Sequence, residues 1–278
     1  MAPSLSVALS GGGAAAFGHV PVLEALDDLG LRPAAIAGAS MGAVLAAAYA
    51  SGLSGAEIRA HPTDMAVSPL DAARRFLRRA AVDPWKPFAG IDALAAVDIA
   101  LPETLPERIE DLAIPFAAVA TDYHARAEKV FDAGPLRPAL AASVSIPAVF
   151  GLTEVDGRVY VDGGVTNNLP VSALPATDLC LAVDVASEPP SQDPAAPSGV
   201  AAAFGAMRIM MKALLDKHLE ARPDAILIQP DSRRFGALDF EKLDEILNAA
   251  APAREETRRR VAEALEDAGA SAARRRSV

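Results

Sequence analysis

The pentapeptide at residues 38–42, Gly-Ala-Ser-Met-Gly, constrains the fold more than any other stretch of this chain. It interrupts a segment, residues 34–51, that begins as a short apolar run and ends as an alanine-rich, helix-forming run. The pattern predicts a strand, a sharp turn and a helix. Such a turn strains the serine, and only very small neighbours such as Gly38 and Gly42 tolerate it. We expect Ser40 to be a candidate nucleophile, although the pattern also fits a serine that only caps the helix.

A second strand, loop and helix precede this unit. An apolar, alternating run at residues 5–10 leads into three consecutive glycines at 11–13 and a helical pattern at 14–29. Pro21 falls inside that pattern, so we expect the helix to start late or to kink near His19. Two such units in series form a βαβα arrangement, which predicts a parallel sheet with helices on its faces.

Further apolar runs predict additional strands of the same sheet. They occupy residues 114–120, 128–131, 158–161, 179–185 and 225–229. A methionine-rich helical pattern follows at 204–219, whose methionines we interpret as core residues, and two helices are expected within 239–267. The chain is therefore expected to be α/β, with three α/β/α layers and a central, mostly parallel sheet.

We expect one domain over residues 1–278, because no boundary or internal repeat is visible. Proline-broken helical sequence at about 64–112 predicts a helical cap over the site. A Pro-rich loop is expected at 187–199 and a disordered tail at 268–278.

The composition of the chain limits which partners it is expected to bind and which cellular compartment it is expected to occupy. The 26 Lys and Arg residues are outnumbered by 36 Asp and Glu residues, and the net charge of −10 disfavours binding to nucleic acid. The single cysteine, Cys180, lies in an apolar run and predicts a buried thiol in a reducing compartment. No basic region precedes the first apolar run, and no apolar run is long enough to span a bilayer. We expect a cytoplasmic protein that contacts membrane surfaces only transiently. The sequence does not indicate the oligomeric state.

Acyl transfer by Ser40 would need a base and hydrogen-bond donors for the oxyanion. The bare backbone of Gly11, Gly12 and Gly13 can supply donors, and so can the N–H of Met41 at the helix start. Phosphate-binding interpretations of the same glycines fail. The lysine of a P-loop is replaced by histidine, and the third glycine of the dinucleotide fingerprint is missing.

Two arrangements compete for the base. An α/β-hydrolase would use a histidine late in the chain, and only His218 lies late enough, although it falls in the middle of a predicted helix. The other candidate is Asp162, which ends a predicted strand and enters a glycine turn. An aspartate there could equally cap its own turn.

Three blocks of sequence, in order, resemble the patatin-like phospholipases, a family of acyl hydrolases with a Ser-Asp dyad. The resemblance spans about residues 5–186. The blocks are Leu-Ser-Gly-Gly-Gly-Ala at 9–14, Gly-Ala-Ser-Met-Gly-Ala at 38–43, and the stretch from Ser-Val-Ser-Ile-Pro at 143–147 to Asp-Gly-Gly-Val-Thr-Asn-Asn-Leu-Pro at 162–170. The chain departs from the family at Ala15 and Ala16, where an arginine or lysine and a glycine are common.

The resemblance implies that Ser40 is the nucleophile, that Asp162 is its base, and that no histidine takes part. It assigns the oxyanion hole to Gly11, Gly12 and Gly13. It also implies hydrolysis of phospholipid or other lipid esters through an acyl-enzyme, without a metal or another cofactor. Two alternatives remain open: a catalytically weak lipid- or acyl-binding protein on the same fold, suggested by the two alanines, and a histidine-dependent α/β-hydrolase.

Overall fold

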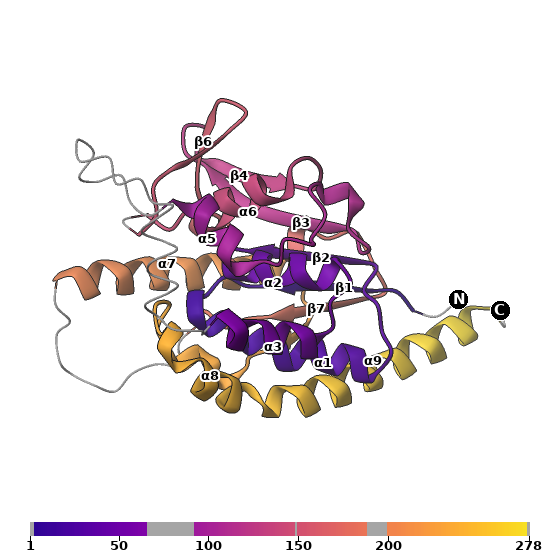
Figure 1. The fold of residues 1–278 in the computed structure, drawn as a ribbon. Helices are drawn as coiled ribbons and strands as arrows, with labels where there is room; N and C mark the ends of the chain where they lie inside the picture. The colour runs from indigo at the N-terminus through magenta and orange to yellow at the C-terminus, as the bar shows by residue number, and fades with distance from the viewer. Residues whose placement is uncertain (1–2, 66–91, 148, 188–198, 277–278) are drawn as a thin grey trace, which may run out of the picture.

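A mostly parallel sheet between helices forms the centre of the computed structural model, which describes residues 3–65, 92–147, 149–187 and 199–276 (Figure 1). Within these ranges the sheet has eight strands in the order β5-β6-β3-β2-β1-β7-β8, and β4 pairs with β3. The strands are β1 (Leu5–Leu9), β2 (Ala35–Ala39), β3 (Phe116–Asp122), β4 (Ala127–Phe131), β5 (Thr153–Val155), β6 (Arg158–Asp162), β7 (Leu179–Val183) and β8 (Ile226–Ile228). The predicted three-layer α/β/α class is confirmed.

Helices cover both faces of this sheet. Those in the described ranges are α1 (Val20–Asp28), α2 (Met41–Ala50), α3 (Gly55–Met65), α5 (Ala93–Ala100), α6 (Leu136–Val144), α7 (Gly199–Glu220), α8 (Leu243–Ala250) and α9 (Pro252–Arg276). Short 3-10 turns are η1 (Gly13–His19), η2 (Ile109–Asp111), η3 (Gly163–Val165), η4 (Val171–Ala173), η5 (Asp231–Arg234) and η6 (Phe240–Lys242). Figure 1 shows α9 running beside α1, and α7 projecting at one side of the molecule.

The strand order brings three chain segments to one end of the sheet. β1 lies parallel to β2 with Leu9 opposite Gly38, so the glycine loop after β1 is adjacent to the serine turn after β2. β3 pairs parallel with β2 and antiparallel with β6, where Ala120 is opposite Asp162. The sheet therefore changes from parallel to antiparallel beside Ser40, and the end of β6 reaches the serine turn from the opposite chain direction.

The two faces of the sheet differ in the size of their side chains. On one face, large residues such as Val7, Leu9 and Ile36 pack against the inner sides of α1, α2 and α6. On the other face the strands present small residues, and the segment around η4 and the end of α7 pack on them. The small residues are Ala8, Ala35, Ala37, Ala117, Cys180 and Ala182. Small side chains let the chain carrying Leu169 approach the sheet closely.

Several local predictions are confirmed with clear physical causes. Pro21 lies in the first turn of α1, where its missing N–H costs nothing, and the preceding η1 ends at His19. The structure also shows that Ser54 and Glu57 exchange hydrogen bonds at the start of α3, forming a capping box. Cys180 is buried.

Other expectations need correction. The expected disordered tail at 268–278 is helical as far as Arg276, because alanines and arginines with high helix propensity continue α9. Part of the expected cap, residues 66–91, and most of the Pro-rich loop, 188–198, lie outside the described residues. The described part of the cap region, α5, packs against α3 and α6.

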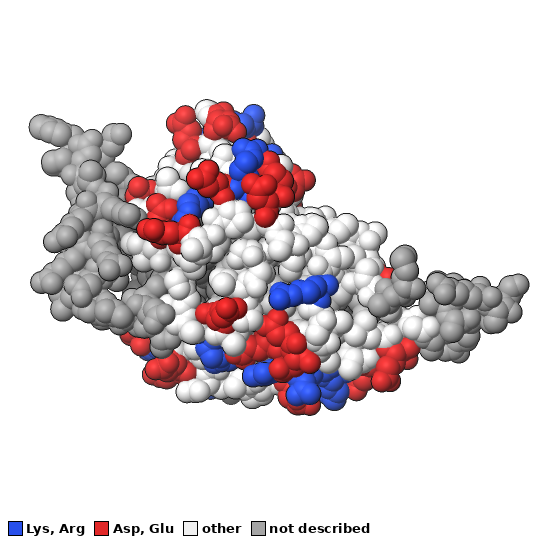
Figure 2. All heavy atoms as spheres, turned by 45° about the vertical axis from the view of Figure 1, so that its right-hand side comes forward, with Lys and Arg blue, Asp and Glu red and all other residues white. Residues whose placement is uncertain are grey.

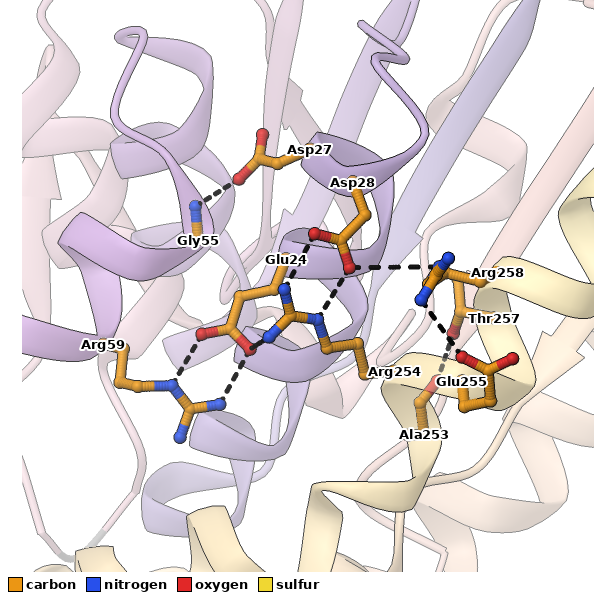
Figure 3. Close-up of polar contacts among 10 residues, drawn as sticks. All are labelled: Glu24, Asp27, Asp28, Gly55, Arg59, Ala253, Arg254, Glu255, Thr257 and Arg258. Carbon is orange, nitrogen blue, oxygen red and sulfur yellow. Dashed lines mark hydrogen bonds and ion pairs between the residues drawn. The ribbon is translucent and has the colours of Figure 1, made fainter.

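An ion-pair cluster joins three helices on the outside of the sheet (Figure 3). Glu24 of α1, nearly buried, binds Arg59 of α3 through two hydrogen bonds of 2.6 and 2.9 Å, and Arg254 of α9 at 3.4 Å. Arg254 also makes two 2.8 Å bonds to Asp28, which hold the pKa of the Asp28 carboxyl below its ordinary value. The cluster connects the last helix to the first, with Glu24 as its buried centre.

On the face shown in Figure 2, Lys and Arg side chains lie among Asp and Glu side chains instead of forming a separate basic patch. None of the helices in the described ranges combines the length and the apolar character needed to cross a membrane.

We predict that Arg59 and Arg254 substitute for one another as partners of Glu24. Arg59→Gln or Arg254→Gln alone should lower the free energy of unfolding by about 1 kcal/mol or less, because the other arginine still neutralises the buried carboxylate. The double variant should lose about 3 kcal/mol, more than the sum, since Glu24 is then buried without a cationic partner. Urea unfolding of the four proteins measures the coupling, and strict additivity would contradict this account.

Candidate active site

Ser40 occupies a strained turn between β2 and α2. Its φ of 52° and ψ of −133° lie in a region that residues with a side chain rarely adopt. The turn is stabilised by the first hydrogen bonds of α2, in which the N–H groups of Ala43 and Val44 donate to the Ser40 carbonyl oxygen. Strain of this kind persists only where the surrounding structure enforces it, and it is concentrated at functional sites.

Gly38 and Gly42 have no room for a side chain. A Cβ on Gly38 would lie 2.5 Å from the backbone nitrogen of Ala43, across the turn. A Cβ on Gly42 would overlap the carbonyl oxygen of Ser10 at the end of β1. The glycines therefore permit both the sharp turn and the close packing of α2 against the first loop, as expected from the sequence.

The Ser40 hydroxyl donates a 2.6 Å hydrogen bond to Oδ2 of Asp162. Oδ1 of the same carboxylate accepts a 2.7 Å bond from the N–H of Gly164, at the start of η3. Burial raises the pKa of Asp162 to about 6, although these two hydrogen bonds favour its ionised form. The carboxylate is thus a stronger base than an ordinary aspartate and directly contacts the hydroxyl that it could deprotonate.

Two serines at the end of α6 hold this pair in position. The Ser143 hydroxyl accepts a 2.8 Å bond from the Ser40 N–H and donates a 2.6 Å bond to the carbonyl oxygen of Val119. Two residues on, the Ser145 carbonyl accepts a 3.0 Å bond from the Asp162 N–H. One short segment therefore fixes the backbone of both partners.

The glycine loop lies against the serine turn. The N–H of Gly11 donates to the carbonyl oxygen of Asn168 at 3.1 Å, so this amide is already occupied. Among the described residues, no hydrogen bond uses the N–H groups of Gly12, Gly13 or Met41, as expected just before or at the start of a helix. Gly12 and Gly13 line the same cavity as Ser40, whereas Met41 does not.

His19 supports this loop from within the protein core. It is fully buried, and its Nε2 is 2.8 Å from the carbonyl oxygen of Ser10, to which the neutral ring donates. Burial lowers the pKa of the imidazole to about 4. His19 therefore stays neutral at physiological pH and braces the residue that precedes the glycines.

A cavity of about 480 Å³ opens above Ser40 and Asp162. Its walls are mainly apolar and come from the segment after α6, from η3, from α7 and from the loop at 236–239. The apolar lining residues are Ile146, Pro147, Val149, Val165, Ala186, Met207, Met211, Leu215, Ala237 and Leu238. Arg208, Lys212 and Asp239 add charge to the lining. A cavity of this size and character fits a ligand with an apolar chain.

Neither a histidine nor a metal cluster contributes to the cavity in the described chain. No histidine is among its lining residues. In the described ranges, His, Cys, Asp and Glu do not gather in groups of three or more that could hold a metal ion.

Comparison with known proteins places the chain in a family. The family model described as patatin-like phospholipase matches residues 7–175, which is more than half of the sequence. The chain belongs to the patatin-like phospholipase family. An uncharacterized NTE family protein of Mycobacterium bovis is 36% identical over 186 residues, covering 66% of this chain and 49% of the relative. Patatin-like phospholipase domain-containing protein 7 of Rattus norvegicus is 29% identical and covers 66% of this chain but 14% of the relative. The chain thus spans about half or less of these relatives.

A solved structure shares the patatin-like fold at low sequence identity. The ExoU–SpcU complex from the type III secretion system of Pseudomonas aeruginosa matches with a TM-score of 0.51 and 16% identity, over 95% of this chain and 52% of that chain. This likeness supports the fold and carries no residue roles to this protein.

Some residues of the site were not predicted from the sequence. Ser143 belongs to the Ser-Val-Ser-Ile-Pro motif, but its contact with the Ser40 N–H depends on α6, for which the sequence pattern gave no helix signal. The methionines of α7 were interpreted as core residues, but Met207 and Met211 line the cavity and Met210 is exposed. Proximity of α7 to the cavity depends on chain packing, for which the local sequence holds no signal.

We predict that Ser143→Ala lowers kcat by at least about tenfold with little change in KM. The substitution removes the hydroxyl that links the Ser40 N–H to the Val119 carbonyl, and the strained turn loses its fixed geometry. Ser143→Thr, which keeps the hydroxyl, should restore part of the rate. Steady-state ester hydrolysis measures both constants.

Ser145→Ala is the matched control for Ser143→Ala. Its buried hydroxyl bonds Ala141 and Thr153 and does not touch Ser40. Equal losses of kcat in the two alanine variants would show that general destabilisation, and not the contact with Ser40, determines the rate.

We also predict that the buried, ionised carboxylate of Asp162 lowers the free energy of unfolding at neutral pH. Its pKa of about 6 in the folded protein lies above its ordinary value of 3.8, so the folded state disfavours the charge. The resulting penalty is absent below pH 4, grows as pH rises to about 6, and then stays near 3 kcal/mol. Asp162→Asn should therefore gain stability relative to the unaltered protein between pH 4 and pH 7. Denaturant unfolding of both proteins at pH 4 and at pH 7 measures the difference between their free energies of unfolding. The same difference at both pH values would contradict a raised pKa of Asp162.

Proposed function

We propose that this protein is a serine acyl hydrolase of lipid esters, with Ser40 as nucleophile and Asp162 as general base. The observation that carries the proposal is the 2.6 Å hydrogen bond between the Ser40 hydroxyl and a desolvated carboxylate, at the floor of a mainly apolar cavity. Membership of the patatin-like phospholipase family supports the same class of substrate.

In the proposed reaction, Asp162 takes the Ser40 proton as Oγ attacks the carbonyl carbon of the ester. The tetrahedral intermediate collapses, and Asp162 returns the proton to the departing alcohol, leaving an acyl group on Ser40. A water molecule then attacks the acyl carbon while Asp162 takes its proton, the bond between this carbon and Ser40 Oγ breaks, and Asp162 returns the proton to Oγ as the fatty acid leaves. A pKa near 6 suits this double role, because the carboxyl group is ionised at neutral pH but still retains basicity.

Backbone amides are proposed to stabilise the oxyanion. Gly12 and Gly13 line the cavity beside Ser40, and their N–H groups carry no hydrogen bond among the described residues. Gly11, included in the expected set, is left out because its amide already binds Asn168. Preorganised donors of this kind each contribute about 3 to 4 kcal/mol to stabilisation of the transition state.

The absence of a basic residue at position 15 has a structural correlate. Ala15 and Ala16 are buried within η1, where a long cationic side chain would not fit without rearrangement. Cationic groups at the cavity come instead from α7, through Arg208 and Lys212. We therefore assign no role in catalysis to the residues of η1 after Gly13 beyond positioning of the loop.

We predict that Ser40→Ala and Asp162→Asn each lower kcat by at least about a thousandfold, with losses that do not add in the double variant, because the two residues act as one unit. His218→Gln, the matched control, should stay within about twofold of the unaltered protein. Hydrolysis of p-nitrophenyl butyrate measures the rates, and circular dichroism confirms folding.

Two results would overturn parts of this assignment. Loss of activity by several orders of magnitude in folded His218→Gln would favour the histidine-dependent α/β-hydrolase. Failure of a fluorophosphonate to label Ser40 would favour the acyl-binding protein.

In the proposed mechanism, kcat/KM should rise with pH through about 6, as Asp162 ionises, and should then remain level to pH 8.

A further inference from the structure

A turn at residues 236–239 packs against the glycine loop. The carbonyl oxygen of Ala237 accepts a 2.9 Å hydrogen bond from the N–H of Ala14, the residue that follows the three glycines. The same oxygen occupies the space beside Gly13, since a Cβ on that glycine would overlap it. Gly13 and all four residues of the turn line the cavity that contains Ser40. The turn therefore contacts the loop at the site itself.

A run of three glycines needs an outside contact to hold one conformation. Gly13 has a φ of 57°, in the left-handed region, which glycine enters without strain and leaves as easily. The N–H of Ala14 belongs to the first turn of η1, where backbone amides have no partner within the helix. By accepting a hydrogen bond from this N–H, the Ala237 carbonyl fixes the peptide plane that follows Gly13. The orientation of the Gly13 N–H, a proposed oxyanion donor, then depends on the turn.

Asp239 closes this turn with both its side chain and its backbone. Its Oδ2 accepts a 2.8 Å hydrogen bond from the Gly236 N–H, and its own N–H donates to the Gly236 carbonyl at 3.3 Å. The Lys242 ammonium lies 3.2 Å from Oδ1 of the same carboxylate. The bond from Gly236, followed by the contact with Lys242, holds the pKa of the Asp239 carboxyl below its ordinary value. Ala237 thus lies between two residues that are bonded to each other.

We propose that Asp239 is a positioning residue for the oxyanion loop, acting through the Gly236 amide and the Ala237 carbonyl on Gly13. This inference rests on the proposed function and adds to it a residue that no sequence motif indicated. In the described chain, Asp239 makes no hydrogen bond with either member of the proposed dyad. Amides stabilise a developing oxyanion best when they are held in place before the reaction, and a loosened turn would let Gly13 reorient.

The contact joins two parts of the chain that lie far apart in sequence. The match to the family model ends at residue 175, and the turn lies some way beyond it. A segment outside the matched region therefore holds the loop that opens the matched region.

The charge of Asp239 alone offers a competing explanation, because the carboxylate lines the cavity and could act on a bound ligand through its field. The two explanations need different properties of the side chain. Positioning needs a hydrogen-bond acceptor at Oδ2, which asparagine supplies without the charge. A field effect needs the charge, which glutamate supplies with its acceptor displaced by one methylene.

The test compares Asp239→Ala, Asp239→Asn and Asp239→Glu in the full-length chain. Lys242→Gln, the matched control, removes the ion pair but leaves the bond between Asp239 and Gly236 in place. Hydrolysis of p-nitrophenyl butyrate separates kcat from KM. An alkyl trifluoromethyl ketone reports the oxyanion site, because Ser40 Oγ would add to its carbonyl carbon, Asp162 would take the proton, and the carbonyl oxygen would become the oxyanion. Inhibition by butyrate reports binding without an oxyanion.

Asp239→Ala and Asp239→Glu should lower kcat by at least about tenfold, with KM and the butyrate inhibition constant within about twofold. The inhibition constant of the ketone should rise by a factor similar to the loss of kcat. Asp239→Asn should stay within about threefold of the unaltered protein and Lys242→Gln within about twofold. Circular dichroism confirms folding, and if Asp239→Ala does not fold, Asp239→Glu and Asp239→Asn carry the same comparison.

Three results would overturn the proposal. One is an equal loss of kcat in folded Asp239→Ala and Asp239→Asn, or full activity in Asp239→Glu, because either would assign the effect to charge. Another is a loss in Lys242→Gln as large as that in Asp239→Ala. The third is a fall in kcat without weaker binding of the ketone.

Hydrogen exchange at the Ala14 amide, followed by NMR, tests the contact without catalysis. Exchange should be at least about tenfold faster in Asp239→Ala than in the unaltered protein, because a loosened turn releases the Ala237 carbonyl. It should stay within about twofold in Lys242→Gln, and unchanged exchange in Asp239→Ala would overturn the inference. If exchange follows this pattern but the unaltered protein hydrolyses no ester, the proposed function fails while the link from Asp239 to the glycine loop stands.

Discussion

The approach of α2 to the end of β1 is the contact on which the site depends. Gly42 packs against the Ser10 carbonyl with no room for a Cβ, and this contact brings the serine turn against the glycine loop. A larger residue would separate the helix from the loop and would move Ser40 away from the amides of Gly12 and Gly13. The backbone, more than any side chain, thus determines the distance between a nucleophile and its candidate oxyanion donors.

The change of strand direction at β3 places Asp162 beside the Ser40 hydroxyl. If the strand paired with the end of β3 were parallel to it, that strand would be followed by a long crossover connection. Here β6 runs antiparallel and delivers Asp162 opposite Ala120, and η3 then supplies the Gly164 amide to its carboxylate. Burial of the carboxylate costs stability and raises its basicity, so the two effects share one cause.

The sequence predicted the parts of the site that depend on local chain geometry. The serine turn, the glycine loop, the late start of α1 just before Pro21 and most strands follow from glycine, proline and apolar patterns within a few residues. The sequence also suggested Asp162, but only the pairing of β6 with β3 shows it beside Ser40. What could not be predicted depends on distant packing: the contact of Ser143 with the Ser40 N–H, the occupied amide of Gly11, and the position of α7 at the cavity. Each joins residues more than 100 positions apart or lies on a helix without a distinctive pattern.

His19, which hydrogen-bonds the Ser10 carbonyl, and Asp162 respond differently to a fall in pH. Because the imidazole stays uncharged down to about pH 4, the brace behind the glycine loop keeps the same hydrogen bond throughout the physiological range. The Asp162 carboxyl, in contrast, changes its charge near pH 6. Mild acidification would therefore protonate the carboxyl group that accepts the Ser40 hydrogen bond without changing the charge of the histidine behind the loop. In the proposed mechanism, protonation of Asp162 would remove the base while the hydrogen bond behind the glycine loop is kept.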